Sequence, residues 1–247
     1  MVMKKVFWII LCMFFILPVI FAENMKLHYE RPAEYFEEAL VIGNGTMGAT
    51  LYGGVKKDKI SFNDITLWTG EPERENSSPD AFNAIPEIRA LLDNEDYQGA
   101  DKAQYKVQGH YSENYQPLGT LTIEYLDDTV GISDYHRWLD IGNATARTQY
   151  LKGGKLFTSD YFASAPDSVI VIRLKSENKE GIHALLSFDS PLPHSSQVAD
   201  NEISVEGYAA YHSFPVYYKA EDKHRYDPER GIHFKTLVRV LSVDGRV

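Results

Sequence analysis

Apolar and polar residues alternate with a period of two between Leu40 and Trp68. Apolar positions continue in the same register, as Ile60 and Phe62, after the polar stretch KKDK at 56–59. A two-residue period puts successive side chains on opposite faces of an extended chain, as in a half-buried β-strand. This segment therefore predicts strands joined by tight turns, with a β-hairpin around KKDK.

The same signal returns at Thr120 and continues to the end of the chain. Alternating or continuous apolar runs are separated by glycine and asparagine, and Lys152-Gly153-Gly154-Lys155 is typical of a hairpin turn. The runs occupy 119–126, 134–151, 155–164, 168–176, 183–190 and 231–243. Short strands at this spacing predict a mainly β protein, an antiparallel β-sandwich.

One segment departs from this pattern. After a polar, proline-bearing loop at 71–80, apolar residues recur at a helical spacing, and we expect a helix beginning around Pro86. Asn94 and Asp96 are residues that favour a helix N-cap, so a second short helix is expected to begin there. The sandwich should therefore carry a short helical insertion.

Three glycines, Gly43, Gly45 and Gly48, have the spacing of a dinucleotide-binding loop, and Asp64 follows at about the right distance for a ribose-binding acid. In such a loop the third glycine opens a helix. Here the pair Gly53-Gly54 follows within one short strand, and no helical apolar stripe is present. We expect a turn between strands, with at least one glycine at positive φ, and no nucleotide cofactor.

The first 22 residues have the pattern of a secretory signal peptide. Lys4 and Lys5 precede an apolar run at 6–20, and Ala22 is a small residue at a plausible cleavage point. A membrane anchor is the alternative, but the run is short for a bilayer span and contains Pro18. We therefore expect an exported, periplasmic or extracellular protein that matures near Ala22.

Charge and cysteine content limit which partners the protein can bind and what stabilises its fold. The formal net charge is −10, without basic clusters, which argues against nucleic acid or anionic membranes as partners. The single cysteine, Cys12, lies inside the predicted signal peptide. The mature protein would have no disulfide, so a hydrophobic core must supply its stability.

Motifs for catalysis or metal binding are not evident. The eight histidines have no metal-ligand spacing, and neither a GxSxG motif nor a P-loop occurs. The acid pairs Glu37-Glu38 and Asp127-Asp128 are adjacent in sequence, so on a strand their side chains would point to opposite faces. We expect no metal, no cofactor and no catalytic residue in this chain.

The stretch NDITLWTG at 63–70 contains the candidate site residues Asn63, Asp64 and Trp68. An amide, a carboxylate and an indole are groups that contact a sugar, through its hydroxyls and its apolar face. Alternatively, Asn63 and Asp64 hold a turn, and Trp68 packs in the core or against a neighbouring domain. We favour the second interpretation. Unless Trp68 packs in the core, these residues are expected to face either the substrate or a domain interface.

The segment LVIGNGTMGATLYGGVKKDKISFNDITLWTGEP resembles the opening of glycoside hydrolase family 95, the α-L-fucosidase family. The resemblance continues in order through AIPEIRALL, YQPLGTLTIEY, YHRWLDIGNATARTQY, FTSDYFASAPDSVIVIRL and LSFDSP, and covers about Leu40 to Val240. The chain departs from the family pattern at Val41, where the family favours proline, at Thr46, where it favours arginine, and at Ile65-Thr66. None of these positions is catalytic in the family.

The resemblance implies an N-terminal β-sandwich that precedes a linker, an (α/α)6 barrel and a C-terminal β domain. In that family the barrel supplies the acid and base of an inverting hydrolysis. Residues 23–247 would then be the N-terminal domain of an exported hydrolase that releases α-L-fucose, or a related L-sugar, from fucosylated glycans. The alternative is a free-standing carbohydrate-binding or accessory β-sandwich.

The C-terminal stretch FKTLVRVLSVDGRV predicts a strand, a turn at Asp244-Gly245 and the beginning of another strand. We therefore expect the sandwich to be incomplete at its C-terminus and the barrel to be missing as its intramolecular partner. The fragment by itself would be inactive.

Overall fold

The computed structural model describes residues 25–72, 80–109, 111–127 and 131–242. The predicted signal peptide and the turn at 244–245 lie outside these residues. The chain divides into two compact units, one within residues 1–67, 117–207 and 235–247, the other comprising 68–116 and 208–234. Each unit is described by itself.

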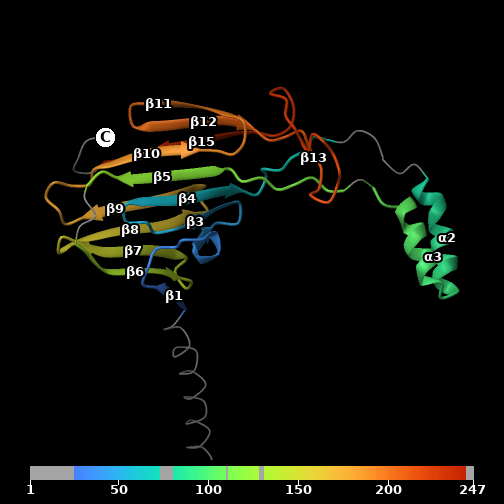
Figure 1. The fold of residues 1–247 in the computed structure, drawn as a ribbon, viewed down its shortest axis with the longest axis horizontal. Helices are drawn as coiled ribbons and strands as arrows, with labels where there is room; N and C mark the ends of the chain where they lie inside the picture. Colours follow the sequence, from blue (N-terminus) through green and yellow to red (C-terminus); the bar gives the residue numbers. More distant parts are fainter. Residues whose placement is uncertain (1–24, 73–79, 110, 128–130, 243–247) are drawn as a thin grey trace, which may run out of the picture. The chain divides into compact units, whose positions relative to one another are not determined.

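The first unit is built on two antiparallel five-stranded sheets (Figure 1). The first sheet has the order β1 (Lys26–Tyr29), β6 (Ile132–Asp140), β7 (Thr145–Lys152), β8 (Lys155–Ser164), β9 (Val169–Ser176). The second has the order β10 (Ala184–Asp189), β5 (Gly119–Tyr125), β4 (Lys57–Asp64), β3 (Met47–Leu51), β2 (Leu40–Gly43). Strands β2 and β3 pack against the first sheet, which confirms the predicted β-sandwich.

A further antiparallel sheet and a short helix complete this part of the fold. The sheet has the order β11 (His194–Ala199), β12 (Glu202–Tyr208), β15 (His233–Arg239), and the 3-10 helix η1 spans Phe36–Glu38. The sequence pattern indicated β15 but not β1, β11 or β12. Every residue of β11 is exposed, and its sequence HSSQVA has no alternation, whereas β1, KLHY, alternates but has only four residues. β12, EISVEGY, alternates and buries its apolar side chains, so its pattern was present but not recognised.

The alternating apolar residues form the core between the two five-stranded sheets. Tyr150 stacks on Phe157 with ring centroids 4.9 Å apart, and Tyr125 meets Phe157 edge-on at 5.2 Å. Aromatic pairs in these arrangements stabilise a core beyond the area they bury. Other buried residues of the sandwich core include Leu40, Ile42, Ala49, Leu51, Ile60, Leu121, Ile123, Ala146, Tyr161 and Phe188.

The glycine-rich stretch is a turn between β2 and β3, as predicted. Gly43 lies opposite Gly48 in the β2–β3 ladder, and no helix begins at Gly48. Gly45 has φ +97°, a conformation that glycine adopts readily. The Asn44 side-chain oxygen accepts from the backbone N–H of Met47 at 2.8 Å, which closes the turn. This geometry removes the basis for a dinucleotide-binding loop.

The β3–β4 turn lies earlier than the polar stretch predicted. Residues 57–59 belong to β4, so the turn occupies the region around Gly53 and Gly54. A Cβ atom at Gly54 would lie 1.9 Å from the Lys57 carbonyl oxygen, and Gly53 has φ +71°. The close approach of the chain to itself therefore requires glycine, and this requirement outweighs the local polarity of the lysines.

The second unit contains the helical insertion. Helix α2 spans Ala81–Asp93, α3 spans Tyr97–Ala103 and the 3-10 helix η2 spans Gln104–Lys106; two short strands, β13 (His212–Ser213) and β14 (His224–Arg225), pair with each other. Both helices were predicted, and the Asp96 carboxylate caps α3 by accepting from the Gly99 N–H at 2.9 Å. Helix α2 begins at Ala81 instead of near Pro86. None of the helices in the described part of the chain is long and apolar enough to cross a membrane.

A buried carboxyl group connects the two sheets of the sandwich. Asp58 of β4 is 1% exposed, and its two oxygens accept from the Gly54 N–H at 2.9 Å and from the Tyr161 hydroxyl of β8 at 2.8 Å. Burial disfavours the charged form and raises the pKa of Asp58 to about 6, although the two hydrogen bonds oppose this shift. Asp58 thus ties the β3–β4 turn to the opposite sheet.

Arg137 of β6 performs a comparable role for the segment after β1. It is 1% exposed, and its guanidinium donates to the carbonyl oxygens of Arg31 and Glu38, each at 2.8 Å. The same group lies 4.3 Å from the centre of the Tyr29 ring, a cation–π distance. A single buried cation therefore anchors residues 29–38 to the first sheet.

The raised pKa of Asp58 predicts a pH dependence of stability. The native pKa of about 6 lies above the unfolded value of about 3.9, so the native state binds more protons between about pH 4 and about pH 6. The free energy of unfolding should therefore fall as pH rises through this window, by about 3 kcal/mol from this group. The variant Asp58→Asn lacks the ionisation and should lose less stability across the window.

Urea unfolding of both proteins from about pH 4 to about pH 7 measures this difference. Asparagine keeps an acceptor for the Gly54 N–H but changes the hydrogen bond with the Tyr161 hydroxyl, so the slope of stability with pH, and not the stability itself, reports the ionisation. Identical dependence of the unfolding free energy on pH in the two proteins would contradict a raised pKa of Asp58 as the cause.

Candidate functional site

Two of the predicted site residues lie side by side at the end of β4. Asn63 pairs with Gly48 and Asp64 with Met47 in the β3–β4 ladder. One Asp64 carboxylate oxygen accepts from both the backbone N–H and the hydroxyl of Thr66, at 2.9 and 2.6 Å. This carboxylate holds the turn that follows β4, as the favoured interpretation predicted for it.

Trp68, the third predicted residue, belongs to the second unit. It forms an isolated antiparallel bridge with Tyr115, and the two rings are tilted by 59° with centroids 5.4 Å apart. Each residue is 41% exposed, so Trp68 is not a core residue. The pair presents aromatic surface of the kind that packs against the apolar face of a sugar or against a neighbouring domain.

The second unit also contains a polar network that no local motif indicated. We call it the Glu113 cluster; it comprises Thr69, Glu113, Asn114, His212, Ser213 and His224. One Glu113 carboxylate oxygen accepts from His212 Nδ1 at 2.8 Å. The other accepts from the Ser213 N–H at 3.0 Å and from the Thr69 hydroxyl. Both oxygens of this part-buried carboxylate are therefore occupied.

Ser213 and His224 form a hydrogen-bonded pair that resembles a Ser-His catalytic dyad. The Ser213 hydroxyl lies 2.8 Å from His224 Nδ1 and accepts from the Asn114 amide, also at 2.8 Å. Nucleophilic catalysis needs a reachable hydroxyl and a base oriented by a third group. Ser213 is 0% exposed, and the acid of the cluster, Glu113, orients His212 instead of His224. The geometry joins three chain segments and does not present a nucleophile.

Aromatic rings extend the cluster. The Tyr111 hydroxyl lies 3.2 Å from His212 Nε2, and partial burial raises the pKa of Tyr111. Phe214 stacks on Tyr218 with centroids 4.9 Å apart, and the Arg225 guanidinium lies 5.3 Å from the centre of the Phe214 ring. This packing positions the chain from 212 to 218.

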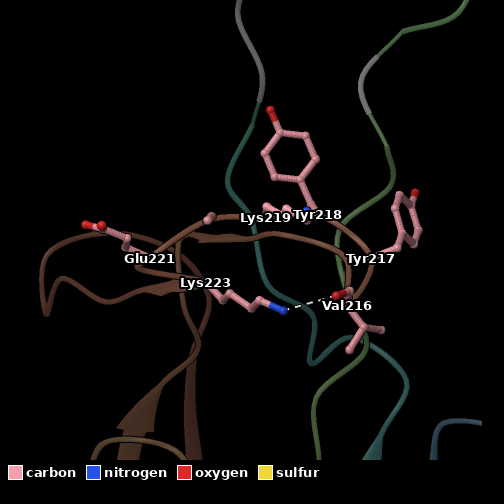
Figure 2. A pocket seen from close by; sticks show the side chains of 7 residues that line it. Val216, Tyr217, Tyr218, Lys219, Glu221 and Lys223 are labelled. Carbon is pink, nitrogen blue, oxygen red and sulfur yellow. Dashed lines mark hydrogen bonds between the residues drawn. The ribbon is translucent and has the colours of Figure 1, made fainter.

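The loop that follows, at 216–223, lines an open surface pocket of about 550 Å³ (Figure 2). Lys223 Nζ donates to the Val216 carbonyl oxygen at 3.0 Å and so closes the loop on itself. Tyr217 is 80% exposed and Val216 is 89% exposed. One short stretch of chain lines the pocket, which therefore suits shallow surface contact more than enclosure of a small molecule.

Sequence spacing could not reveal the Glu113 cluster. Glu113 and His212 are 99 residues apart, as are Asn114 and Ser213. In the sequence the histidines are scattered, and only the pairing of distant segments brings His212 and His224 close to an acid and a serine. A weak indication was the acid and amide at 113–114 shortly before YQPLG, one of the motifs of the family resemblance.

Comparison with known proteins defines the class to which this fold belongs. Residues 27–247 match the family model described as "Glycosyl hydrolase family 65, N-terminal domain". The chain belongs to this family of glycoside hydrolase N-terminal domains.

Individual relatives are α-fucosidases by name. The chain is 31% identical over 228 residues to "Alpha-L-fucosidase 2" of Arabidopsis thaliana, which covers 90% of the chain and 27% of that protein. It is 28% identical over 169 residues to "Probable alpha-fucosidase A" of Aspergillus niger, which covers 64% of the chain and 21% of that protein. The chain thus spans about a quarter of the length of these curated relatives.

The Glu113 cluster predicts a specific stability effect. Glu113→Ala removes both acceptor oxygens, so the Ser213 N–H and the Thr69 hydroxyl lose this hydrogen-bond partner. Leaving such a group unpaired should cost about 1–3 kcal/mol. Hydrogen exchange at the Ser213 amide should therefore be about fivefold to 140-fold faster in this variant, since 1.4 kcal/mol corresponds to tenfold.

The matched control is Tyr217→Ala, at an exposed position in the loop that follows the cluster. It should leave the Ser213 exchange rate unchanged. Equal exchange rates in the Glu113→Ala variant and the unmodified protein would show that the cluster does not hold these segments together.

Proposed function

We propose that this chain is the N-terminal, non-catalytic β-sandwich domain of an exported α-L-fucosidase of glycoside hydrolase family 95. The observation that carries the proposal is the similarity over 90% of the chain to a protein named as an α-L-fucosidase, of which the chain covers 27%. The match to a glycoside hydrolase N-terminal domain supports the position of the domain in the longer protein. The family 95 assignment rests on the motifs around Gly43–Gly70.

In this proposal the domain supports catalysis that other parts of the enzyme perform. An inverting glycosidase needs an acid and a base about 6.5–9.5 Å apart across the scissile bond. Two carboxyl groups of the described residues stabilise the fold and are not free to act as this acid and base. Asp58 is buried between the sheets, and Glu113 accepts hydrogen bonds from three donors. The acid and base would come from an (α/α)6 barrel that acts as the domain's intramolecular partner.

The proposed substrate is a glycan that carries α-L-fucose or a related L-sugar. The relatives' names support fucose. Export follows from the predicted signal peptide, and N-terminal sequencing of the exported protein is expected to begin within a few residues of Glu23. Intact Met1 in a membrane fraction would contradict export by cleavage.

The activity prediction uses an exchange of domains. The 247-residue chain alone should not hydrolyse an aryl α-L-fucoside. Replacing the matching N-terminal segment of the Arabidopsis α-L-fucosidase by residues 27–240 of this chain should give a protein that does hydrolyse it. A control fusion that carries an unrelated β-sandwich should be inactive. Hydrolysis by the isolated chain, after removal of host hydrolases, would place the catalytic carboxylates here and overturn the proposal.

A free-standing carbohydrate-binding domain is the second candidate, favoured by the exposed Trp68–Tyr115 pair. Binding of fucosylated glycans by the isolated chain, lost in Trp68→Ala and kept in Tyr217→Ala, would support this candidate. If the isolated chain binds no glycan and the domain exchange yields an active enzyme, the first candidate holds.

A further inference from the structure

Two histidines and a glutamate meet at one edge of the first sheet. His28 lies in β1, Glu30 follows directly after it, and His136 lies in β6. Each offers a ligand atom, and the three atoms lie within 4.8 Å of one another. Among the residues that the structure describes, this is the one group of at least three such side chains close enough to share a metal ion.

The strand pairing explains why the three side chains meet. β1 and β6 are antiparallel, with Tyr29 opposite Arg137, so Glu30 falls next to His136 as the pairing continues. Alternate residues of a strand share a face, which places His28 with Glu30. Tyr29 and Arg137 point to the other face, where Arg137 is buried. The two sets of side chains are thus separated by the sheet.

A β-bulge affects the position of His136. The β6–β7 register shifts between Ser133 and His136, and Asp134 within this interval has φ +50°. Bulges bend a strand and redirect its side chains, and they occur preferentially next to functional sites. The His136 ring lies 5.1 Å from the His28 ring, between centroids, with a tilt of 31°.

His136 also has an unsatisfied nitrogen. Its Nδ1 atom is buried and has no hydrogen-bond partner among the described residues. Buried polar atoms are almost always paired, and an exception calls for a specific cause such as a bound ion. This observation is independent of the proximity of the three side chains.

We propose that His28, Glu30 and His136 form a binding site for a zinc-type transition metal ion. Two imidazoles and one carboxylate are ligands that zinc accepts, with water in the fourth position. Ligand atoms around one tetrahedral zinc ion lie about 3.3 Å apart, given metal–ligand bonds of about 2.0–2.1 Å. Adjustment of exposed side chains such as His28 and Glu30 reaches this spacing from the observed arrangement.

The bound ion would fasten β1 to the sheet. β1 is a four-residue edge strand whose residues are all classed as exposed, and among the described strands it pairs with β6 alone. A metal that binds the folded state and bridges β1 and β6 stabilises this pairing by mass action. The sequence led us to expect no metal, because His136 is distant from His28 and Glu30 and the spacing of the three forms no motif.

The test is metal titration of the full chain, purified with a histidine-free tag and stripped with a chelator. Isothermal titration calorimetry should show one Zn²⁺ bound per chain, and the midpoint of thermal unfolding should rise with Zn²⁺. Co²⁺ in the same site should give d–d absorption bands. His28→Gln, Glu30→Gln and His136→Gln should each weaken Zn²⁺ binding at least about tenfold, because each removes a direct ligand.

His183→Gln is the matched control, an exposed histidine outside the cluster, and it should bind Zn²⁺ as the unmodified protein does. Urea unfolding without metal checks that each variant is folded, and His28→Gln, at an exposed position, is the variant least disturbed. No Zn²⁺ binding by the unmodified protein, or equal affinity in the unmodified protein and His28→Gln, would overturn the proposal.

Discussion

The hydrogen bond between the Tyr161 hydroxyl and the Asp58 carboxyl is the contact on which the sandwich most depends. It joins β8 of one sheet to β4 of the other at 2.8 Å, inside a core that is mainly apolar and aromatic but also contains buried Thr148 and Ser159. A buried carboxyl group without partners would be strongly unfavourable, so the two sheets can pack here only in the register that supplies those partners. The contact therefore specifies how the sheets fit together.

The turn between β3 and β4 follows from the same contact. Asp58 also accepts from the Gly54 N–H, and the Tyr135 hydroxyl donates to the Gly53 carbonyl oxygen at 2.6 Å. A side chain at either glycine would collide with its surroundings. The pair Gly53-Gly54, which in the sequence argued against a nucleotide-binding helix, is thus needed for the turn to approach the opposite sheet. Raised carboxyl pKa values often mark catalytic acids, but here full burial gives the shift a structural cause.

Local patterns predicted the parts of the fold that local physics determines. Alternation located β5 to β10, and the capping residue Asp96 located α3. The exposed strand β11 could not be predicted, because an edge strand without a buried face needs no alternation, and β1 is too short, at four residues, to give a signal. β12 does alternate, and its pattern was overlooked. For the candidate site, the Asp64 turn was foreseen from sequence. The Glu113 cluster and the group of His28, Glu30 and His136 were not, because their members meet only through long-range pairing.

A double-mutant cycle on Asp58 and Tyr161 tests most directly whether this contact couples the sheets. Unfolding free energies of the unmodified protein, Asp58→Ala, Tyr161→Phe and the double variant give the coupling energy between the two side chains, because each single substitution removes their hydrogen bond. The account predicts a favourable coupling of about 1–3 kcal/mol, the range expected for residues in one buried hydrogen-bonded pair. Additive effects of the two substitutions, with no coupling, would contradict it.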